Sequence, residues 1–320
     1  MTFFDDNSSL PPDQEPPSPF RDEPVHRADL SEPPAPVAEP PLAGDPISLA
    51  AASPQPAPSY SAKPSLPEDL RISWSWPHFI LFLFFGFASL IVVQGGFAIY
   101  YAPLHHFSNQ KDFERFVLSK PAFAIGSMVL WYTLIFLFLY VTLSVLRGFP
   151  FWRTLGWRKL TRRGGLPQNP WLYFLAGCVL SVVVFIVTAK VQPPENVPIE
   201  ELFRYKNTAL LFMAMAVLVA PLVEETVFRG YLYPLFAKTF GVAFSVILTG
   251  VLFGLMHGAQ LGWTWGLVLV LIVIGIIFTF ARALTGSVFA SFLLHLGYNS
   301  TIAAVTILGT QGFTKFPSAH

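Results

Sequence analysis

Beyond residue 70 the chain consists of seven long apolar runs joined by short polar connections. The runs cover about residues 78–101, 121–146, 171–189, 208–236, 242–258, 263–281 and 287–308. A helix rises about 1.5 Å per residue, so a run of about 20 apolar residues can cross the hydrocarbon core of a bilayer. The alternation typical of a membrane β-barrel is missing, and no internal repeat stands out. The pattern predicts an all-α fold, a polytopic transmembrane helical bundle of about seven spans.

The first 70 residues have a different pattern, with almost no periodic apolar positions. They hold 17 of the 29 prolines, and 12 acidic residues against 3 basic ones. Such a segment cannot bury enough apolar surface to offset its ordering entropy. We therefore predict a disordered, acidic, Pro-rich tail at 1–70 and a transmembrane domain at 71–320. The tail lacks the basic and apolar regions of a signal peptide. It is expected to be a passive tether, with docking of an unidentified partner as the alternative.

Composition agrees with a membrane protein, since 53% of the residues are hydrophobic and 12% are charged. The cations lie mainly in loops between apolar runs, which the topology of a membrane protein explains without nucleic acid. The most basic loop contains Arg147, Arg153, Arg158, Lys159, Arg162 and Arg163. By the positive-inside rule this loop and the tail are cytoplasmic, with Lys238 and Arg282 as flanks on the same side. A bacterial inner membrane is the expected location. The aromatic segment 149–157 is expected along the membrane surface.

The single cysteine, Cys178, lies inside an apolar run. One cysteine allows neither an intrachain disulfide nor a multi-cysteine zinc site. We expect Cys178 to be a small packing residue.

The fourth run contains three ionisable side chains, Glu224, Glu225 and Arg229. A charge at the centre of a bilayer is costly, so these side chains must face something polar. Arg229 lies one helical turn from Glu225 and is placed to neutralise it. Glu224 has no cation at helical spacing, which is hard to explain by structure alone. Pro221 removes a helix hydrogen bond just before the charges, so a kink with room for water is expected.

Two further runs carry polar residues at helical spacing. Phe253 and His257 are four residues apart in the fifth run, as are His295 and Asn299 in the seventh. Residues four apart lie on one face of a helix. We therefore expect the polar residues of the three runs to form one buried site, with Phe253 as part of its wall. The fifth run also has glycines at 250, 254 and 258, a spacing that lets membrane helices approach closely.

The available residue types narrow the chemistry. The chain contains no Gly-x-Ser-x-Gly and no His-Glu-x-x-His, and Asp112 is the only aspartate beyond residue 70. A serine elbow, a zincin motif and a membrane-embedded aspartyl dyad are therefore excluded. What remains is a Glu/His/Asn set. A carboxylate in this setting can act as a base, while imidazoles and an amide hold a water and stabilise an oxyanion. These parts suit hydrolysis of an amide by activated water.

At these residues the sequence resembles the intramembrane proteases grouped as CAAX prenyl proteases and bacteriocin-processing enzymes, also called the Abi or CPBP family. That family has three motifs in order on successive membrane helices: Glu-Glu-x-x-x-Arg, Phe-x-x-x-His and His-x-x-x-Asn (or Asp). The matching segments here are complete and read Glu224-Glu225-Thr226-Val227-Phe228-Arg229, Phe253-Gly254-Leu255-Met256-His257 and His295-Leu296-Gly297-Tyr298-Asn299. The resemblance covers about residues 205–308.

The resemblance implies a role for each polar residue. Glu224 and His257 correspond to the pair that holds and activates the attacking water. His295 and Asn299 correspond to the pair that stabilises the oxyanion, and Glu225 with Arg229 forms the adjoining ion pair. One Glu and two His are also a zinc-ligand set, so Glu224, His257 and His295 are metal candidates and metal dependence stays open.

The resemblance implies an endopeptidase acting on membrane-associated, prenylated or precursor peptides. Two other functions fit a membrane protein of this composition. An ion-coupled transporter also places Glu, Arg and His in the membrane, although the first three runs hold no matching set. A non-catalytic scaffold or immunity protein could keep the fold, although it would not need every polar residue of the motifs. Membrane lipid and a peptide or protein substrate are the expected partners.

Overall fold

The computed structural model describes residues 67–101, 103, 107–109, 112–113, 116–117, 120–161, 165–189 and 205–313. The described residues all belong to one compact unit, Ser61–His320. Nearly all of the predicted disordered tail lies outside the described residues. So does most of an interfacial helix that the pattern predicts at 199–206.

Every regular element in the described part is a helix, which confirms the predicted fold class. Six helical segments are long and apolar enough to span a membrane. A seventh apolar helix, α10, is shorter. The first three spans are α1 (Trp76–Tyr101), α3 (Pro121–Tyr140) extended by the π-helical turn η3 (Val141–Val145), and α5 (Pro170–Thr188). The others are the segment Lys206–Phe240, α11 (Trp265–Thr285) and α12 (Val288–Gly309), while α10 covers Val242–Met256.

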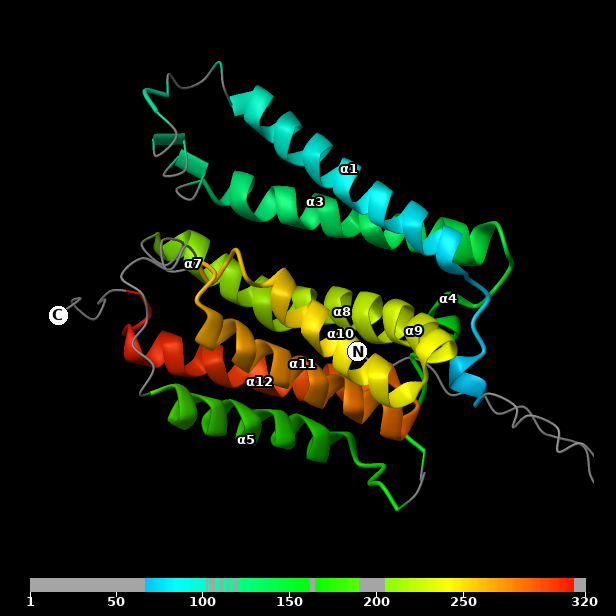
Figure 1. Ribbon diagram of the computed structural model, residues 1–320. Helices are drawn as coiled ribbons and strands as arrows, with labels where there is room; N and C mark the ends of the chain where they lie inside the picture. Colours follow the sequence, from blue (N-terminus) through cyan, green and yellow to red (C-terminus); the bar gives the residue numbers. More distant parts are fainter. Residues whose placement is uncertain are drawn as a thin grey trace, which may run out of the picture. The chain divides into compact units, whose positions relative to one another are not determined.

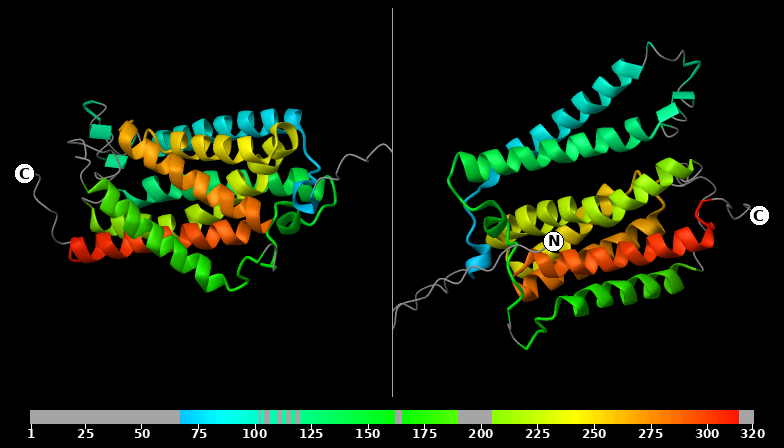
Figure 2. Two further views of the ribbon diagram at one scale, coloured as in Figure 1. Left: turned by 60° about the horizontal axis from the view of Figure 1, so that its bottom comes forward. Right: turned by 180° about the vertical axis from the view of Figure 1, so that it is seen from behind.

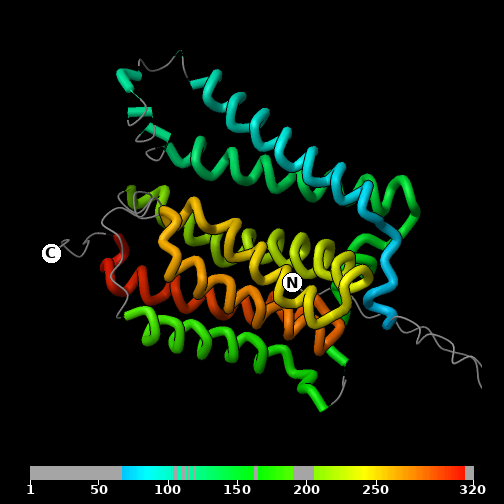
Figure 3. Tube along the Cα trace, in the orientation of Figure 1, coloured from blue at the N-terminus to red at the C-terminus, as the bar shows by residue number. Residues whose placement is uncertain are grey.

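The helices lie roughly along one direction, with the motif-bearing segment in the middle (Figures 1 and 3). α1 and α3 form an antiparallel pair on one side of this segment. On the other side, α10 packs along α11 and α5 packs along α12 (Figures 1 and 2). The motif segment therefore contacts α10 and α12, which carry the other two motifs.

The motif segment is continuous but changes its helical type along its length. It consists of α7 (Lys206–Ala214), the π-helical turn η4 (Met215–Val219), α8 (Ala220–Glu224), the π-helical turns η5 (Glu225–Leu232), and α9 (Tyr233–Phe240). The N–H of Ala220 bonds to the carbonyl of Met215. In this register residue 221 would bond to the carbonyl of Ala216, but Pro221 has no N–H. The expected loss of a hydrogen bond therefore takes the form of wide turns beside the charges.

Glycines set the closest helix contacts. A Cβ on Gly177 of α5 would lie 2.0 Å from the carbonyl oxygen of Leu294, and one on Gly297 of α12 would lie 2.0 Å from that of Phe174. A Cβ on Gly250 or Gly254 of α10 would lie 2.6 Å from a backbone nitrogen of α11. The predicted close approach along the α10 glycines is thus present, although Gly258 contacts the Trp263 ring in the loop that follows.

The segment before α1 is attached to the helical bundle. Residues 68–70 form a 3-10 turn, and Leu70 is buried against Tyr233 of α9. Arg282 is fully buried and forms an ion pair of 2.9 Å with Asp69. The prediction that Arg282 is an ordinary basic flank is therefore wrong. Its carboxylate partner comes from a segment assigned to the tail, which the sequence pattern did not connect to α11.

The basic loop also packs more deeply than expected. Phe151, in the short helix α4 (Phe151–Thr154), and Leu155 are buried in the main apolar cluster. Trp157 donates a hydrogen bond to the hydroxyl of Thr226, 3.1 Å away. Phe149 and Trp152 present half-exposed rings, so the segment 149–157 is part of the core as well as the surface.

Candidate active site

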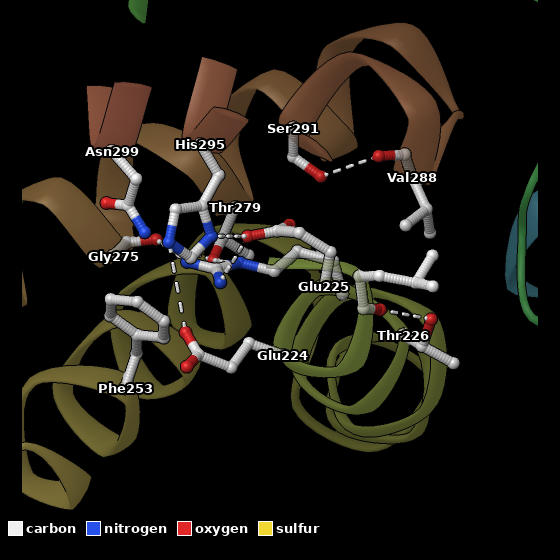
Figure 4. Close-up of polar contacts among 12 residues, drawn as sticks. Glu224, Glu225, Thr226, Phe253, Gly275, Thr279, Val288, Ser291, His295 and Asn299 are labelled. Carbon is white, nitrogen blue, oxygen red and sulfur yellow. Dashed lines mark hydrogen bonds and ion pairs between the residues drawn. The ribbon is translucent and has the colours of Figure 1, made fainter. Parts of the chain in front are cut away.

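The three motifs meet at one place, where α8 and η5 face α10 and α12 (Figure 4). Glu224 is the last residue of α8, and Glu225 and Arg229 follow on η5. Phe253 lies on α10, with His257 at its C-terminal cap. His295 and Asn299 lie one turn apart on α12. The sequence prediction that these residues share one polar site is reproduced by the geometry.

Glu225 and Arg229 form the buried base of the site, with both side chains fully excluded from the surface. Nη1 of Arg229 lies 2.8 Å from Oε1 of Glu225. The other guanidinium nitrogens donate to α11, Nη2 to the Gly275 carbonyl at 2.9 Å and Nε to the Thr279 hydroxyl at 3.2 Å. A buried charge must be paired and hydrogen-bonded to be tolerated, and Arg229 meets both conditions.

His295 connects this base to the second carboxylate. Its Nδ1 lies 3.0 Å from Oε1 of Glu225, and its Nε2 lies 3.9 Å from Oε2 of Glu224. A carboxylate oxygen accepts hydrogen bonds, so Nδ1 of His295 carries the proton and donates it. The Glu225 contact therefore fixes the ring orientation of His295 and turns Nε2 toward Glu224.

His257 is held in the same way by the backbone. Its Nδ1 lies 2.7 Å from the carbonyl oxygen of Phe253, an acceptor, so Nδ1–H is again the donor. Its Nε2 lies 3.9 Å from Oε2 of Glu224. The two imidazoles thus present their Nε2 atoms to the same carboxylate oxygen.

Glu224 differs from Glu225 in its surroundings. Its Oε2 atom is buried and has no hydrogen-bond partner within the part of the chain that the structure describes. The side chain is 17% exposed and lines a cavity. Such a carboxylate oxygen, facing two imidazole nitrogens, is expected to hold a small polar group.

Asn299 and Phe253 complete the surroundings. The side-chain amide of Asn299 donates a 2.7 Å hydrogen bond to the carbonyl of Ala216, the group that Pro221 leaves without a helical partner. Asn299 therefore ties α12 to the wide turn, and one of its two N–H groups remains. Phe253 is buried, with its ring 4.7 Å from that of His257 and 5.8 Å from that of His295, as expected for a wall of the site.

The site opens into a cavity of about 540 Å³. Glu224, His257, His295 and Asn299 lie on its wall, which is otherwise mostly apolar. α5, α7, α11 and the second half of α12 supply most of the apolar surface, and α3 contributes Met128 and Tyr132. The cavity has room for an extended apolar or peptide group beside the carboxylate.

The three metal candidates do not fit a zinc ion as they are arranged. Zinc bonds of about 2.0–2.1 Å in a tetrahedral site place two donors about 3.3 Å apart. The Glu224 Oε2 atom instead lies 3.9 Å from each imidazole Nε2. Among the described residues no group of three or more His, Cys, Asp or Glu side chains is arranged for a metal.

Sequence reasoning missed the part that α11 plays. Its run has no ionisable residue before Arg282 and was expected to be only structural, yet Gly275 and Thr279 hold the guanidinium of Arg229. Their spacing of four residues places both on one helical face, a weak signal in an apolar run. Tyr132, from a helix far from the motifs in sequence, was also not anticipated.

The part of the chain that contains the three motifs matches a known protein family. Residues 206–301 match the family model described as type II CAAX prenyl endopeptidase Rce1-like. The chain contains an Rce1-like domain. This domain begins where α7 begins and ends two residues after Asn299, so it includes all three motifs. α1, α3 and α5 lie outside it. No curated protein and no solved structure matches the chain.

The match to this family model supports a CAAX-type intramembrane protease at the level of the family. Together with the spanning helices, it makes the chain an integral, multi-pass membrane protein.

Proposed function

We propose that the chain is an intramembrane endopeptidase in which Glu224 activates a water to hydrolyse a peptide bond. The observation that carries this proposal is the unpartnered Oε2 of Glu224, 3.9 Å from Nε2 of His257 and of His295. A water molecule fits between Oε2 of Glu224 and one imidazole Nε2. With hydrogen bonds of about 2.8 Å to both atoms, the angle at the water oxygen is about 90°. Its two protons then point at Glu224 and His257.

The remaining residues support the charge that develops. Two carboxylates against one guanidinium leave the cluster one negative charge, and a proton on His295 balances it. Protonated His295 donates from Nε2, and Asn299 donates from its remaining N–H. Both are placed to stabilise an oxyanion on the substrate. Glu225 and Arg229 orient His295 and do not touch the substrate.

In the proposed reaction, Glu224 carries one proton from the attacking water to the leaving amine. The water oxygen attacks the carbonyl carbon as its proton passes to Glu224, and the carbonyl π electrons move to the oxygen. When the tetrahedral intermediate collapses, the C–N bond breaks. Glu224 gives the proton to the departing amine, which restores the carboxylate.

The cavity suggests the substrate class. Its apolar wall along α5, α7 and α12 suits a membrane-associated peptide, a prenylated C-terminus or the apolar part of a precursor peptide. We propose a bacterial inner membrane as the location. The basic loop, by the positive-inside rule, supports a cytoplasmic position for the acidic tail.

The test is cleavage by the full chain reconstituted in liposomes. A proteome-derived peptide library that also contains farnesylated CAAX peptides is incubated with wild type, Glu224→Gln and Glu68→Gln, and new termini are read by mass spectrometry. Glu68→Gln is the matched control, because Glu68 is an exposed carboxylate outside the cavity. We expect cleavage by wild type and Glu68→Gln and none by Glu224→Gln. Equal cleavage by Glu224→Gln, or none by wild type, overturns the proposal.

A further inference from the structure

The cavity wall contains a polar group from outside the Rce1-like domain. Met128 and Tyr132 of α3 both line the cavity that contains Glu224. They are four residues apart, so they lie on one face of α3, the face turned to the cavity. α3 packs against α7, the first part of the motif segment.

The Tyr132 hydroxyl is a free hydrogen-bond donor. The ring contacts Trp131, with centroids 5.6 Å apart, but within the described part of the chain the hydroxyl has no hydrogen-bond partner. It lines the same cavity as Glu224. A tyrosine O–H inside a protein normally finds a partner, so this one is available to a bound molecule.

Most hydrogen-bond donors around Glu224 are already used within the protein. Nδ1–H of His257 and of His295 are used by the Phe253 carbonyl and by Glu225. One N–H of Asn299 is used by the Ala216 carbonyl. The oxyanion of a tetrahedral intermediate requires donors that are already in place.

Two other hydroxyl groups of the cavity are already used by backbone carbonyls. Thr188 and Thr301 donate to carbonyls of their own helices, Val184 and Gly297. Tyr298 is 7% exposed and packs with Phe278 in an apolar cluster. Tyr132 is the cavity tyrosine that comes from outside the Rce1-like domain.

We propose that the Tyr132 hydroxyl donates a hydrogen bond to the carbonyl oxygen of the scissile bond and to the oxyanion that forms from it. This inference rests on the proposed function. It makes α3 part of the active site, so the Rce1-like domain alone is catalytically incomplete.

The test compares Tyr132→Phe, Tyr140→Phe and Glu224→Gln in the full chain, with a peptide that wild type cleaves in the library. Tyr140→Phe is the matched control, because it removes a half-exposed hydroxyl from the same helix outside the cavity. Loss of one oxyanion donor lowers kcat by about 10²–10³-fold. We expect that loss in Tyr132→Phe, with KM nearly unchanged and the melting temperature equal to that of Tyr140→Phe.

A second variant separates a donor from a packing residue. Replacing Tyr132 by 3,5-difluorotyrosine keeps the shape of the ring but makes the phenol more acidic. A donor role moves the alkaline limb of the kcat–pH profile to lower pH, whereas a packing role leaves it in place.

The outcomes separate the two proposals. Wild-type kcat in Tyr132→Phe beside an inactive Glu224→Gln overturns the role of Tyr132 and leaves the proposed function standing. A change in KM alone, or an unmoved pH profile, also overturns the donor role. Full activity of Glu224→Gln, or no peptide cleaved by wild type, overturns both.

Discussion

Arg229 shows how a charge is accommodated inside this bundle. Each of its guanidinium nitrogens has an acceptor, supplied by Glu225, Gly275 and Thr279. The Phe253 ring lies 4.5 Å from the guanidinium carbon and covers one face of it. The ion pair is therefore enclosed by hydrogen bonds and an aromatic ring, and in the proposed function it orients His295 through Glu225.

The first prediction follows from this enclosure. Arg229→Gln leaves the Glu225 carboxylate buried without its partner, which costs about 3–5 kcal/mol of the free energy of unfolding. Adding Glu225→Gln removes the second charge and recovers part of that loss. Cleavage stays abolished, because His295 has lost the carboxylate that orients it. Denaturant unfolding in detergent micelles and the cleavage assay measure the two effects.

Lys238→Gln is the control, since Lys238 is an exposed cation later in the same helical segment. It should leave stability and cleavage unchanged. If Arg229→Gln is as stable as Lys238→Gln, the ion pair does not make the predicted contribution to the free energy of unfolding.

The second prediction concerns metal. The 3.9 Å separations between Glu224 Oε2 and the imidazole nitrogens are wider than a shared zinc permits. We therefore expect protein dialysed against a strong chelator to keep its cleavage rate, and added zinc to give no increase. The bound metal is measured in parallel by mass spectrometry. Loss of cleavage that stoichiometric zinc restores would instead mean that the three side chains close around a metal.

At the scale of helices, close packing at glycines positions the catalytic face of α12. Gly297 lies between His295 and Asn299 in sequence and rests against the backbone of α5 at Phe174. Gly177 makes the reciprocal contact from α5. A shift of α5 is thus transmitted directly to the segment that carries two site residues.

The third prediction tests that contact. In Gly297→Ala the new Cβ meets a backbone carbonyl oxygen, which cannot rotate away, so the two helices must separate. Overpacking of this kind usually costs about 1–3 kcal/mol, and we expect a lower melting temperature together with reduced cleavage. Gly95→Ala on α1 is the control, because a Cβ there meets nothing within 4 Å. Equal melting temperatures for the two variants would show that the α5–α12 contact is loose.

The sequence predicted the elements well and their partners less well. Apolar runs identify spans because the bilayer demands continuous apolar helices, and residues four apart share a face on any helix. The convergence of Glu224, His257 and His295 was predictable on those grounds. The contact of Arg229 with α11 was not, because a carbonyl and a threonine hydroxyl leave no mark in an apolar pattern. Arg282 was misread because its partner, Asp69, lies in a segment that composition assigned to the tail.

At the scale of the whole molecule, the cavity lies toward one set of helix ends. Its wall includes the last turn of α5, the second half of α12 and the residues just after α10. It also includes the first half of the motif segment and of α3. All of these lie toward the ends opposite the basic loop between α3 and α5, whereas His295 and Phe278 line the cavity from the halves of α12 and α11 nearer that loop. If that loop is cytoplasmic, as its arginines predict, most of the cavity lies in the non-cytoplasmic half of the membrane.

The last prediction tests this orientation. Cys178 is the only cysteine, so Cys178→Ala gives a background for single-cysteine labelling. Ser108→Cys places an exposed thiol in the connection between α1 and α3, and Arg153→Cys places one in the basic loop. In intact cells a membrane-impermeant maleimide should label the Ser108→Cys variant and should label the Arg153→Cys variant only after lysis. That result means that substrates present their scissile bond from the non-cytoplasmic side, because the cavity lies toward the ends near residue 108. The reverse labelling would turn the cavity toward the cytoplasm and require substrates that reach the membrane from that side, with the chemistry at Glu224 unchanged.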